Sequence, residues 1–267
     1  MNYKYLIGSG CSFSESNVSW LNNFNIENTF NLARGGCGNK YIQNSIIKLV
    51  DTLLQQNVSV DDILVGVQFT GIARLDFMVS EQTQTINNSL DDFYNHTKID
   101  KKSAWVHSGG SNSFVTHHEA EEFQDKYFLK YYKYFMTDLE NWYNFLIYVI
   151  TLQSFLKSHN IKYFFHTSWN LLTTGKYNTN LLVNNFEKFK VFNYLWNQVD
   201  KDKFIFCKSN LRNISPNKAD NYSEYGGMWQ YMYEKNGIDP DNHHPNDYGQ
   251  KIWGDYLKEN AISRGII

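Results

Sequence analysis

Short hydrophobic runs alternate with helical patterns along the chain, and this alternation constrains the fold more than any other feature. The runs cover residues 5–7, 29–33, 62–69, 161–166 and 204–206. Helical spacing of apolar residues follows at 40–56, 124–158 and 185–198, and again after Pro245. Strands that alternate with helices favour a parallel sheet covered on both faces. The sequence therefore predicts an α/β fold, a three-layer α/β/α sandwich around a central parallel sheet.

One polar segment interrupts the alternation after the third predicted strand. Residues 76–123 carry many Ser, Thr and Asn residues and show no sustained apolar period. A chain of 267 residues with 42% hydrophobic residues is long enough for one large domain. We therefore predict a single domain over residues 1–267, with 76–123 as an insertion over the mouth of the site.

The balance of basic and acidic residues indicates which kinds of partner the chain attracts. The chain has 25 basic and 27 acidic residues, so no net field attracts nucleic acid or an anionic membrane. No run approaches the roughly 20 apolar residues that cross a bilayer, and the first apolar run is too short for a signal peptide. We expect a cytoplasmic protein with no nucleic-acid partner and no membrane insertion.

The cysteines do not form a metal-binding pattern. Cys11, Cys37 and Cys207 lack the paired spacing of a metal site. The interpretation we prefer is that of small, buried residues beside tight turns.

Residues suited to catalysis fall where the predicted strands end. Ser12 follows the first strand, Gly36 the second and Thr70 the third, while His244 precedes the last helix. In parallel sheets, ligands bind at the carboxyl ends of the strands. These residues are therefore expected to meet at one edge of the sheet.

Asp241 and His244 form an Asp-x-x-His-Pro motif with Pro245, and Ser12 stands near the other end of the sequence. A carboxylate can orient an imidazole, and the imidazole can take the proton of a serine hydroxyl. Ser12, which we expect to open a helix, could alone be a helix cap, and Asp-x-x-His alone could be a surface pair. Their joint occurrence at strand ends favours a catalytic triad.

Taken together, these motifs resemble the SGNH (GDSL-type) hydrolase superfamily, whose fold is flavodoxin-like. The resemblance lies in short blocks: residues 10–14 with Ser12, residues 31–39 with two candidate glycines, and residues 241–245. It implies that Ser12 is the nucleophile, His244 the base and Asp241 its orienting partner. It also implies that the Ser12 and Gly36 amides, with Gly38 as the alternative glycine, hold the oxyanion without a cofactor.

The third block of this family is atypical here. The family carries Gly-x-Asn-Asp, whereas this chain has Gln68-Phe69-Thr70-Gly71. Thr70 stands near the position of the Asn, whose amide donates to the oxyanion. Thr70, Gln68 or another group substitutes for it, or the enzyme is slow, since losing such a donor costs about a hundredfold or more in rate.

Further candidates concern substrate and metal binding. Arg74, Gln68 and Trp105 are candidate substrate-binding residues, although Arg74 could instead pair with Asp76. The histidine- and glutamate-rich residues 117–122 form a solvated face in our interpretation, because adjacent histidines on a helix diverge. We assign no metal.

The resemblance implies hydrolysis of a carboxylic ester through an acyl-serine intermediate. We expect a small acyl group, such as acetyl, on a carbohydrate, because the polar and aromatic insertion suits a sugar more than a lipid. The substrate is thus a small-molecule or saccharide ester. A lipid or thioester acyl hydrolase, an acyltransferase and a non-catalytic binding protein remain alternatives, and the sequence leaves the oligomeric state open.

Overall fold

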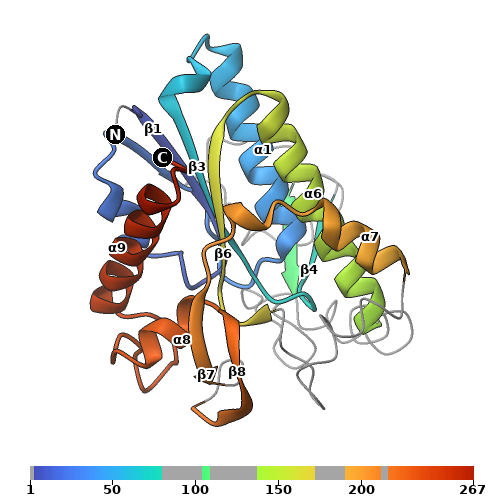
Figure 1. Cartoon of the computed structure of the whole chain (residues 1–267). Coiled ribbons are helices and arrows are strands. Elements are labelled where there is room, and N and C mark those ends of the chain that lie inside the picture. Colours follow the sequence, from blue (N-terminus) through green and yellow to red (C-terminus); the bar gives the residue numbers. More distant parts are fainter. Residues whose placement is uncertain (1–2, 80–103, 109–136, 172–189, 212–215) are drawn as a thin grey trace.

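The structure is a computed structural model that describes residues 3–79, 104–108, 137–171, 190–211 and 216–267 (Figure 1). Its centre is a parallel sheet of four strands in the order β2-β1-β3-β6. The strands are β1 (Tyr5–Ser9), β2 (Asn28–Asn31), β3 (Ile63–Phe69) and β6 (Lys162–Thr167). The predicted α/β fold with a central parallel sheet is confirmed.

Helices flank both faces of this sheet (Figure 1). Helices α1 (Asn39–Gln55) and α6 (Asp138–Ser158) lie on one side, and α9 (Asp247–Ser263) lies on the other. Every residue of β3 is buried, as expected for a strand covered on both faces. The sheet and its helices thus form the three layers that the alternation predicted.

The helices pack through the apolar faces that their sequences carry. In α1, Ile42, Ile46 and Val50 recur at helical spacing and are fully buried. The final helix buries Trp253 and Leu257, and its N-cap is Asn246, whose side chain accepts from the Gly249 N–H at 2.8 Å. The predicted α6 begins later than expected, at Asp138, and residues 124–136 of the predicted range lie outside the described residues.

The predicted fifth strand does not join the sheet as a strand. A single parallel bridge links Phe165 to Phe204, and the Ile205 N–H donates to the Phe165 carbonyl at 2.8 Å. The chain then turns away into β7 (Cys207–Leu211), which pairs antiparallel with β8 (Lys218–Gly226). The prediction was wrong in its extent, because residues 204–206 make a single bridge to β6 and continuous pairing begins only at Cys207, with β8 as the partner.

The remaining elements are short. They comprise the 3₁₀ turns η1 (Trp20–Phe24), η2 (Val60–Asp62) and η7 (Lys201–Lys203), and the helices α7 (Lys190–Gln198) and α8 (Met228–Tyr233). Strands β4 (Leu75–Val79) and β5 (Ala104–Ser108) pair antiparallel within the predicted insertion, most of which lies outside the described residues. None of the helices in the described part of the chain is long and apolar enough to cross a membrane.

Candidate active site

The segments that follow the four parallel strands are joined by hydrogen bonds at the carboxyl edge of the sheet. The Arg34 N–H, after β2, donates to the Gly10 carbonyl after β1 at 3.0 Å. The Ser168 N–H, after β6, donates to the Phe69 carbonyl at the end of β3 at 2.8 Å. The candidate residues that the sequence placed at strand ends therefore belong to one connected edge.

Ser12 lies in a turn of the segment 10–16, here called the serine loop. The Ser14 N–H donates to the Cys11 carbonyl at 2.8 Å, but no helix follows. The carbonyls that a helix would use are taken by distant side chains, because Phe13 accepts from Gln250 Nε2 at 2.6 Å and Ser14 accepts from Asn31 Nδ2 at 2.7 Å. The expectation that Ser12 opens a helix was wrong.

The structure brings Ser12 and His244 together. His244 Nε2 lies 3.0 Å from Ser12 Oγ, although the two residues are 232 positions apart in the sequence. The Phe13 ring packs edge-on against the imidazole, with 5.3 Å between the ring centroids. The 3.0 Å between His244 Nε2 and Ser12 Oγ is within the hydrogen-bond reach that a base and a nucleophile need.

The partner on the other side of the imidazole is a backbone carbonyl. His244 Nδ1 lies 2.9 Å from the Asn242 oxygen, so Nδ1–H can donate there and leave Nε2 as the acceptor for Ser12 Oγ–H. Asp241 is exposed, and its carboxylate makes no hydrogen bond within the described residues. The structure thus differs from the predicted Asp241–His244 contact, because the loop turns the carbonyl of Asn242 toward the ring.

The segment 237–246, here called the histidine loop, is closed by its own backbone. The Asp239 N–H donates to the His244 carbonyl at 2.8 Å, and the Asn246 N–H donates to the Gly237 carbonyl at 3.1 Å. His243 takes a left-handed backbone conformation, with φ of 58°. This reversal of the backbone sets the direction in which the His244 side chain points.

Two side chains inside the histidine loop were missed by the sequence reasoning. Asp239 accepts from the Asp241 N–H and from Asn242 Nδ2, each at 2.9 Å. The Asn242 Oδ1 in turn accepts from the His244 N–H at 2.8 Å. Asp and Asn residues in tight loops commonly bond the backbone two residues ahead, which is the signal that could have identified them.

The glycine turn after β2 lies beside the serine. A Cβ added at Gly35 would lie 4.0 Å from Ser12 Cβ. Gly36 has a φ of 72°, a conformation that favours glycine. Within the described residues, the N–H groups of Ser12 and Gly36 have no hydrogen-bond acceptor. Both amides are therefore available to a ligand.

Gly38, the alternative donor, is engaged elsewhere. Its N–H donates to Asp76 Oδ1 at 2.7 Å, and the Tyr41 N–H donates to Asp76 Oδ2 at the same distance. Asp76 thereby caps the start of α1 from strand β4, where its negative charge suits the helix N-terminus. This leaves Gly36 as the candidate glycine.

Thr70 is held by its backbone and is fully buried. Asn39 Oδ1 accepts from the Thr70 N–H at 2.8 Å, and Asn39 Nδ2 donates to the Thr70 carbonyl at 3.0 Å. The Thr70 hydroxyl is buried without a hydrogen-bond partner in the described part of the chain. It is the one group of Thr70 left to donate to an oxyanion.

Gln68 supports the serine loop from within the core. Its Oε1 accepts from the Cys11 N–H at 3.2 Å and lies 3.3 Å from Cys11 Sγ. Its side chain is fully buried, and a Cβ added at Gly10 would lie 2.8 Å from the same oxygen. The structure therefore places Gln68 behind the loop, which differs from the predicted contact with substrate.

The cysteines agree with the interpretation as small buried residues. All three are free and buried. Burial raises the pKa of the Cys37 thiol well above its usual range, so the thiol stays protonated, and it donates to the Gly10 carbonyl at 3.1 Å. Cys37 thus adds a second bond between the glycine turn and the serine loop.

Arg74 lies against an aromatic residue that the sequence reasoning missed. Its guanidinium carbon is 5.4 Å from the Trp169 ring centroid, and Nη1 donates to the Cys37 carbonyl at 3.4 Å. The Trp169 ring packs edge-on against Phe13 with 5.7 Å between centroids. Phe13, Trp169 and Arg74 thus form a row of contacts that reaches His244, with both rings buried, whereas the side chain of Trp105 lies outside the described residues.

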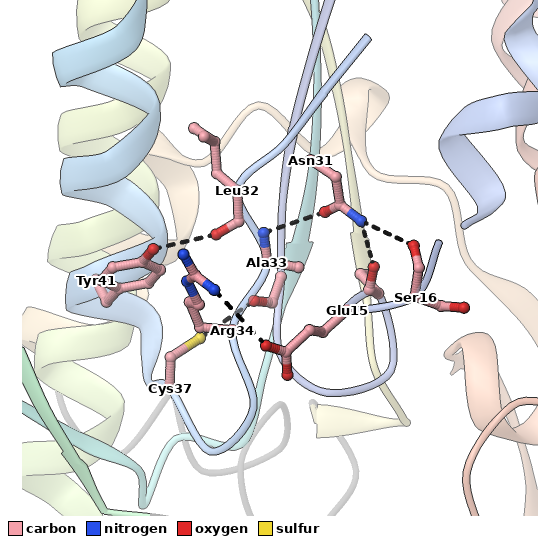
Figure 2. Close-up of polar contacts among 10 residues, drawn as sticks. Glu15, Ser16, Asn31, Leu32, Ala33, Arg34, Cys37 and Tyr41 are labelled. Carbon is pink, nitrogen blue, oxygen red and sulfur yellow. Dashed lines mark hydrogen bonds and ion pairs between the residues drawn. The ribbon is translucent and has the colours of Figure 1, made fainter. Parts of the chain in front are cut away.

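Figure 2 shows how β2 supports the serine loop. Asn31 donates to the carbonyls of Ser14 and Ser16 and accepts from the Ala33 N–H at 3.1 Å. Arg34 Nη1 lies 4.0 Å from the Glu15 carboxylate, and the Arg34 side chain is largely buried. This polar cluster fixes the two loops side by side.

The metal candidate at 117–122 lies outside the described residues. Within the described ranges, no group of three or more His, Cys, Asp and Glu side chains is arranged to hold a metal ion.

Among the solved structures that match this chain, two align over nearly its whole length. An inferred acylhydrolase from Bacteroides fragilis NCTC 9343 is 10% identical, with a TM-score of 0.39, over 99% of this chain and 88% of its own. The acetyl xylan esterase AlAXEase is 10% identical, with a TM-score of 0.38, over 96% of this chain and 98% of its own. No family model and no curated protein matches the chain. The functional argument therefore rests on the geometry of this chain.

Proposed function

We propose that this protein is a serine ester hydrolase that works through an acyl-serine intermediate. The observation that carries the proposal is the 3.0 Å contact between His244 Nε2 and Ser12 Oγ. The contact couples a base to a hydroxyl at the carboxyl edge of a parallel sheet, where such folds bind ligands. The resemblance to SGNH hydrolases points to the same two residues.

In the first half of the reaction, Ser12 Oγ attacks the ester carbonyl while its proton passes to His244 Nε2. The carbonyl oxygen becomes an oxyanion, which the free N–H groups of Ser12 and Gly36 can stabilise. The Asn242 carbonyl accepts from His244 Nδ1–H and so favours the imidazolium that forms. His244 then gives its proton to the departing alkoxide, and the acyl group stays on Ser12.

In the second half, a water molecule takes the place of the alcohol. His244 accepts a proton from the water as it attacks the acyl carbonyl, and the same two amides stabilise the second oxyanion. Collapse of this intermediate returns the proton from His244 to Ser12 and releases the acid. Thr70 would add a third donor only if its hydroxyl, buried in this structure, came within reach of the oxyanion.

For the substrate, we propose a small acyl group, such as acetyl, on a carbohydrate. The half-buried Arg74, whose guanidinium carbon lies 5.4 Å from the Trp169 ring centroid, supports this choice, since a cation beside the site can donate hydrogen bonds to the hydroxyl groups of a sugar. A lipid or thioester acyl hydrolase would need a deeper apolar site, and an acyltransferase would use the same serine and histidine with another acceptor.

A non-catalytic binding protein is the second candidate, and one observation favours it. Thr70 is fully buried, so the third oxyanion donor of the resembling family has no evident replacement. The loss of one such donor lowers kcat by about a hundredfold to a thousandfold. A site that retains its serine and histidine could then bind an ester without turning it over.

Labelling with a fluorophosphonate probe tests the two candidates. We expect the wild-type protein to be labelled, whereas Ser12→Ala should lose all labelling and His244→Ala should be labelled about a thousandfold more slowly. Ser16→Ala is the matched control, because Ser16 lies in the same loop and only its hydroxyl contact with the Val18 N–H is lost. A folded wild-type protein that resists the probe would exclude the hydrolase.

A series of p-nitrophenyl esters then tests the acyl group. We expect kcat/KM to be highest for acetate and to fall as the chain grows. A preference for acyl chains of about eight carbons or more would instead indicate the lipid alternative, because such chains need a pocket that buries them.

A further inference from the structure

A pocket lies beyond β6, at the side of the sheet where residues 204–206 run. Its volume is about 450 Å³, within the usual range for a small-molecule site. The last turns of α9 contribute Tyr256, Asn260 and Arg264 to its wall. Because α9 rises about 1.5 Å per residue from Asp247, Arg264 lies about 25 Å along the helix from the end near His244. The pocket is therefore separate from the candidate active site.

Positive charge predominates among the described residues that line this pocket. Lys201, Lys208 and Arg264 contribute cations, and Glu224 contributes the carboxylate. Lys208 Nζ lies 3.8 Å from Glu224 Oε1, and both side chains are more than two-thirds exposed. Such an exposed pair is weak, so Lys208 can exchange its partner at little cost. The pocket therefore favours an anionic group.

Aromatic rings supply the rest of the wall. Phe206 packs edge-on against Tyr225 with 5.3 Å between centroids, and Lys201 Nζ lies 5.0 Å from the centroid of Trp196. Aromatic faces bind the flat apolar face of a ring, including the C–H face of a sugar. A cation held beside an aromatic face can thus contact an anionic group while the ring stacks.

The walls are held by partly buried hydrogen bonds from side chains to backbone carbonyls. The Tyr256 hydroxyl donates to the Phe206 carbonyl at 2.8 Å, and Arg264 Nη1 donates to the Phe204 carbonyl at 2.7 Å. These bonds tie α9 to the segment that follows the Phe165–Phe204 bridge. A preformed wall lowers the entropy that a ligand loses on binding.

We propose that this pocket binds an acidic sugar, that is, a saccharide unit that carries a carboxylate or a phosphate. Lys208 and Lys201 contact the anionic group, and the rings of Tyr225 and Trp196 contact the sugar face. This binding is independent of the proposed hydrolysis at Ser12, so it occurs equally in Ser12→Ala.

Isothermal titration calorimetry on the Ser12→Ala protein tests the proposal, with glucuronate, glucose 6-phosphate and adenosine monophosphate as anionic probes and glucose as the neutral one. We expect saturable binding of at least one anionic probe, at least about tenfold tighter than glucose, since a charge-assisted hydrogen bond contributes about 1.5 kcal/mol or more. The three anionic probes distinguish a carboxylate from a phosphate and a simple sugar from a nucleoside.

Three variants in the Ser12→Ala background locate the binding. The double substitution Lys201→Ala with Lys208→Ala should weaken the bound probe by about tenfold or more, whereas Lys48→Ala, an exposed lysine of α1, should leave it unchanged. Glu224→Gln should strengthen binding by about threefold, because it frees Lys208 from its carboxylate partner. Thermal unfolding of each variant confirms that it is folded.

The same titrations can overturn the proposal. It is excluded if no anionic probe binds saturably, or if glucose binds as tightly as the acidic sugars. It is also excluded if the double lysine variant binds like Lys48→Ala, since the charge would then lie outside this pocket.

Discussion

The serine loop and the histidine loop meet at Ser12 and His244, yet they are held in opposite ways. The serine loop is mostly buried, and its hydrogen bonds reach Asn31, Gln68 and Gln250, which are far away in the sequence. The histidine loop is half-buried or exposed after Gly237, and apart from the Ser12 contact its hydrogen bonds stay between Met232 and Gln250, close by in the sequence. One half of the candidate site is positioned by the core and the other by local turns.

This difference separates stability from activity. A change behind the serine loop disturbs buried polar groups, so it should lower the free energy of unfolding as well as the rate. A change in the histidine loop leaves the core intact, so its effect should appear in kcat alone. The following variants test that division, beginning with the largest expected effect.

Gln68→Leu should have the largest effect. It removes the acceptor of the buried Cys11 N–H, and we expect the free energy of unfolding to fall by about 2–3 kcal/mol. The displaced Ser12 should also lower kcat by about tenfold to a hundredfold. Urea unfolding and ester hydrolysis measure the two losses.

Gln43→Leu is the matched control for Gln68→Leu. Gln43 is a buried glutamine of α1 whose side chain has no hydrogen bond within the described residues. This variant should keep the wild-type kcat. A kcat for Gln68→Leu that matched this control would show that the core does not position Ser12.

His166 should make the core behind the serine loop sensitive to acid. Burial lowers the pKa of His166 to about 3, and its Nδ1 accepts from Trp253 Nε1 at 3.2 Å. The ring packs on Trp20, whose Nε1 donates to Ser14 Oγ at 2.7 Å. Protonation of His166 therefore acts on the support of the serine loop.

The sign follows from which state binds the proton. Between pH 6.5 and 3, His166 is protonated in the unfolded chain and neutral in the folded chain. The contribution of His166 to the free energy of unfolding is therefore fully present above pH 6.5 and is lost as the pH falls toward 3. We expect the His166 contribution to fall by about 2 kcal/mol between pH 7.5 and 5. In urea unfolding, the free energy of unfolding of His166→Gln should therefore fall less than that of the wild type between pH 7.5 and 5, by this amount. The control His159→Gln, at the C-cap of α6, should lose as much free energy of unfolding as the wild type does.

Asp241→Asn should have the smallest effect. The Asn242 carbonyl, not the Asp241 carboxylate, faces His244 Nδ1, so we expect kcat to change by less than about twofold. In a triad that depends on the carboxylate, the same change lowers kcat by about ten thousandfold. Steady-state hydrolysis distinguishes the two outcomes clearly.

Asp239→Ala completes the test of the histidine loop. It removes two hydrogen bonds that shape the loop and should lower kcat by about tenfold, whereas the free energy of unfolding should fall by less than about 1 kcal/mol, because both bonds are exposed to water. A larger loss for Asp241→Asn than for Asp239→Ala would contradict the role that we propose for the carbonyl.

The sequence predicted the parts of the fold that depend on hydrophobic period. The four strands of the sheet and helix α1 lie close to their predicted ranges, since apolar spacing records which face is buried. The fifth predicted strand, residues 204–206, makes only one bridge to β6, at Phe204, and the chain then enters β7, which pairs with the polar strand β8. Pairing between strands depends on the competing partner, which hydrophobic period alone does not reveal.

The candidate site divides in the same way. The sequence indicated Ser12 and His244 from their motifs, but the roles of Gln68 and Asn242 could not be predicted. Gln68 acts through a contact 57 positions away, and Asn242 acts through its backbone, which every residue possesses. Side-chain chemistry is visible in a sequence, whereas the direction of a carbonyl depends on the folded loop.

The Ser12–His244 contact joins residues 232 positions apart, and α9 secures it through Gln250, which accepts from the Trp20 N–H and donates to the Phe13 carbonyl. Contacts of such long range close late in folding, because the intervening chain must first lose its entropy. During refolding, ester hydrolysis should therefore return after the circular dichroism signal of the helices. The return of activity would then report the final docking of α9 rather than the formation of secondary structure.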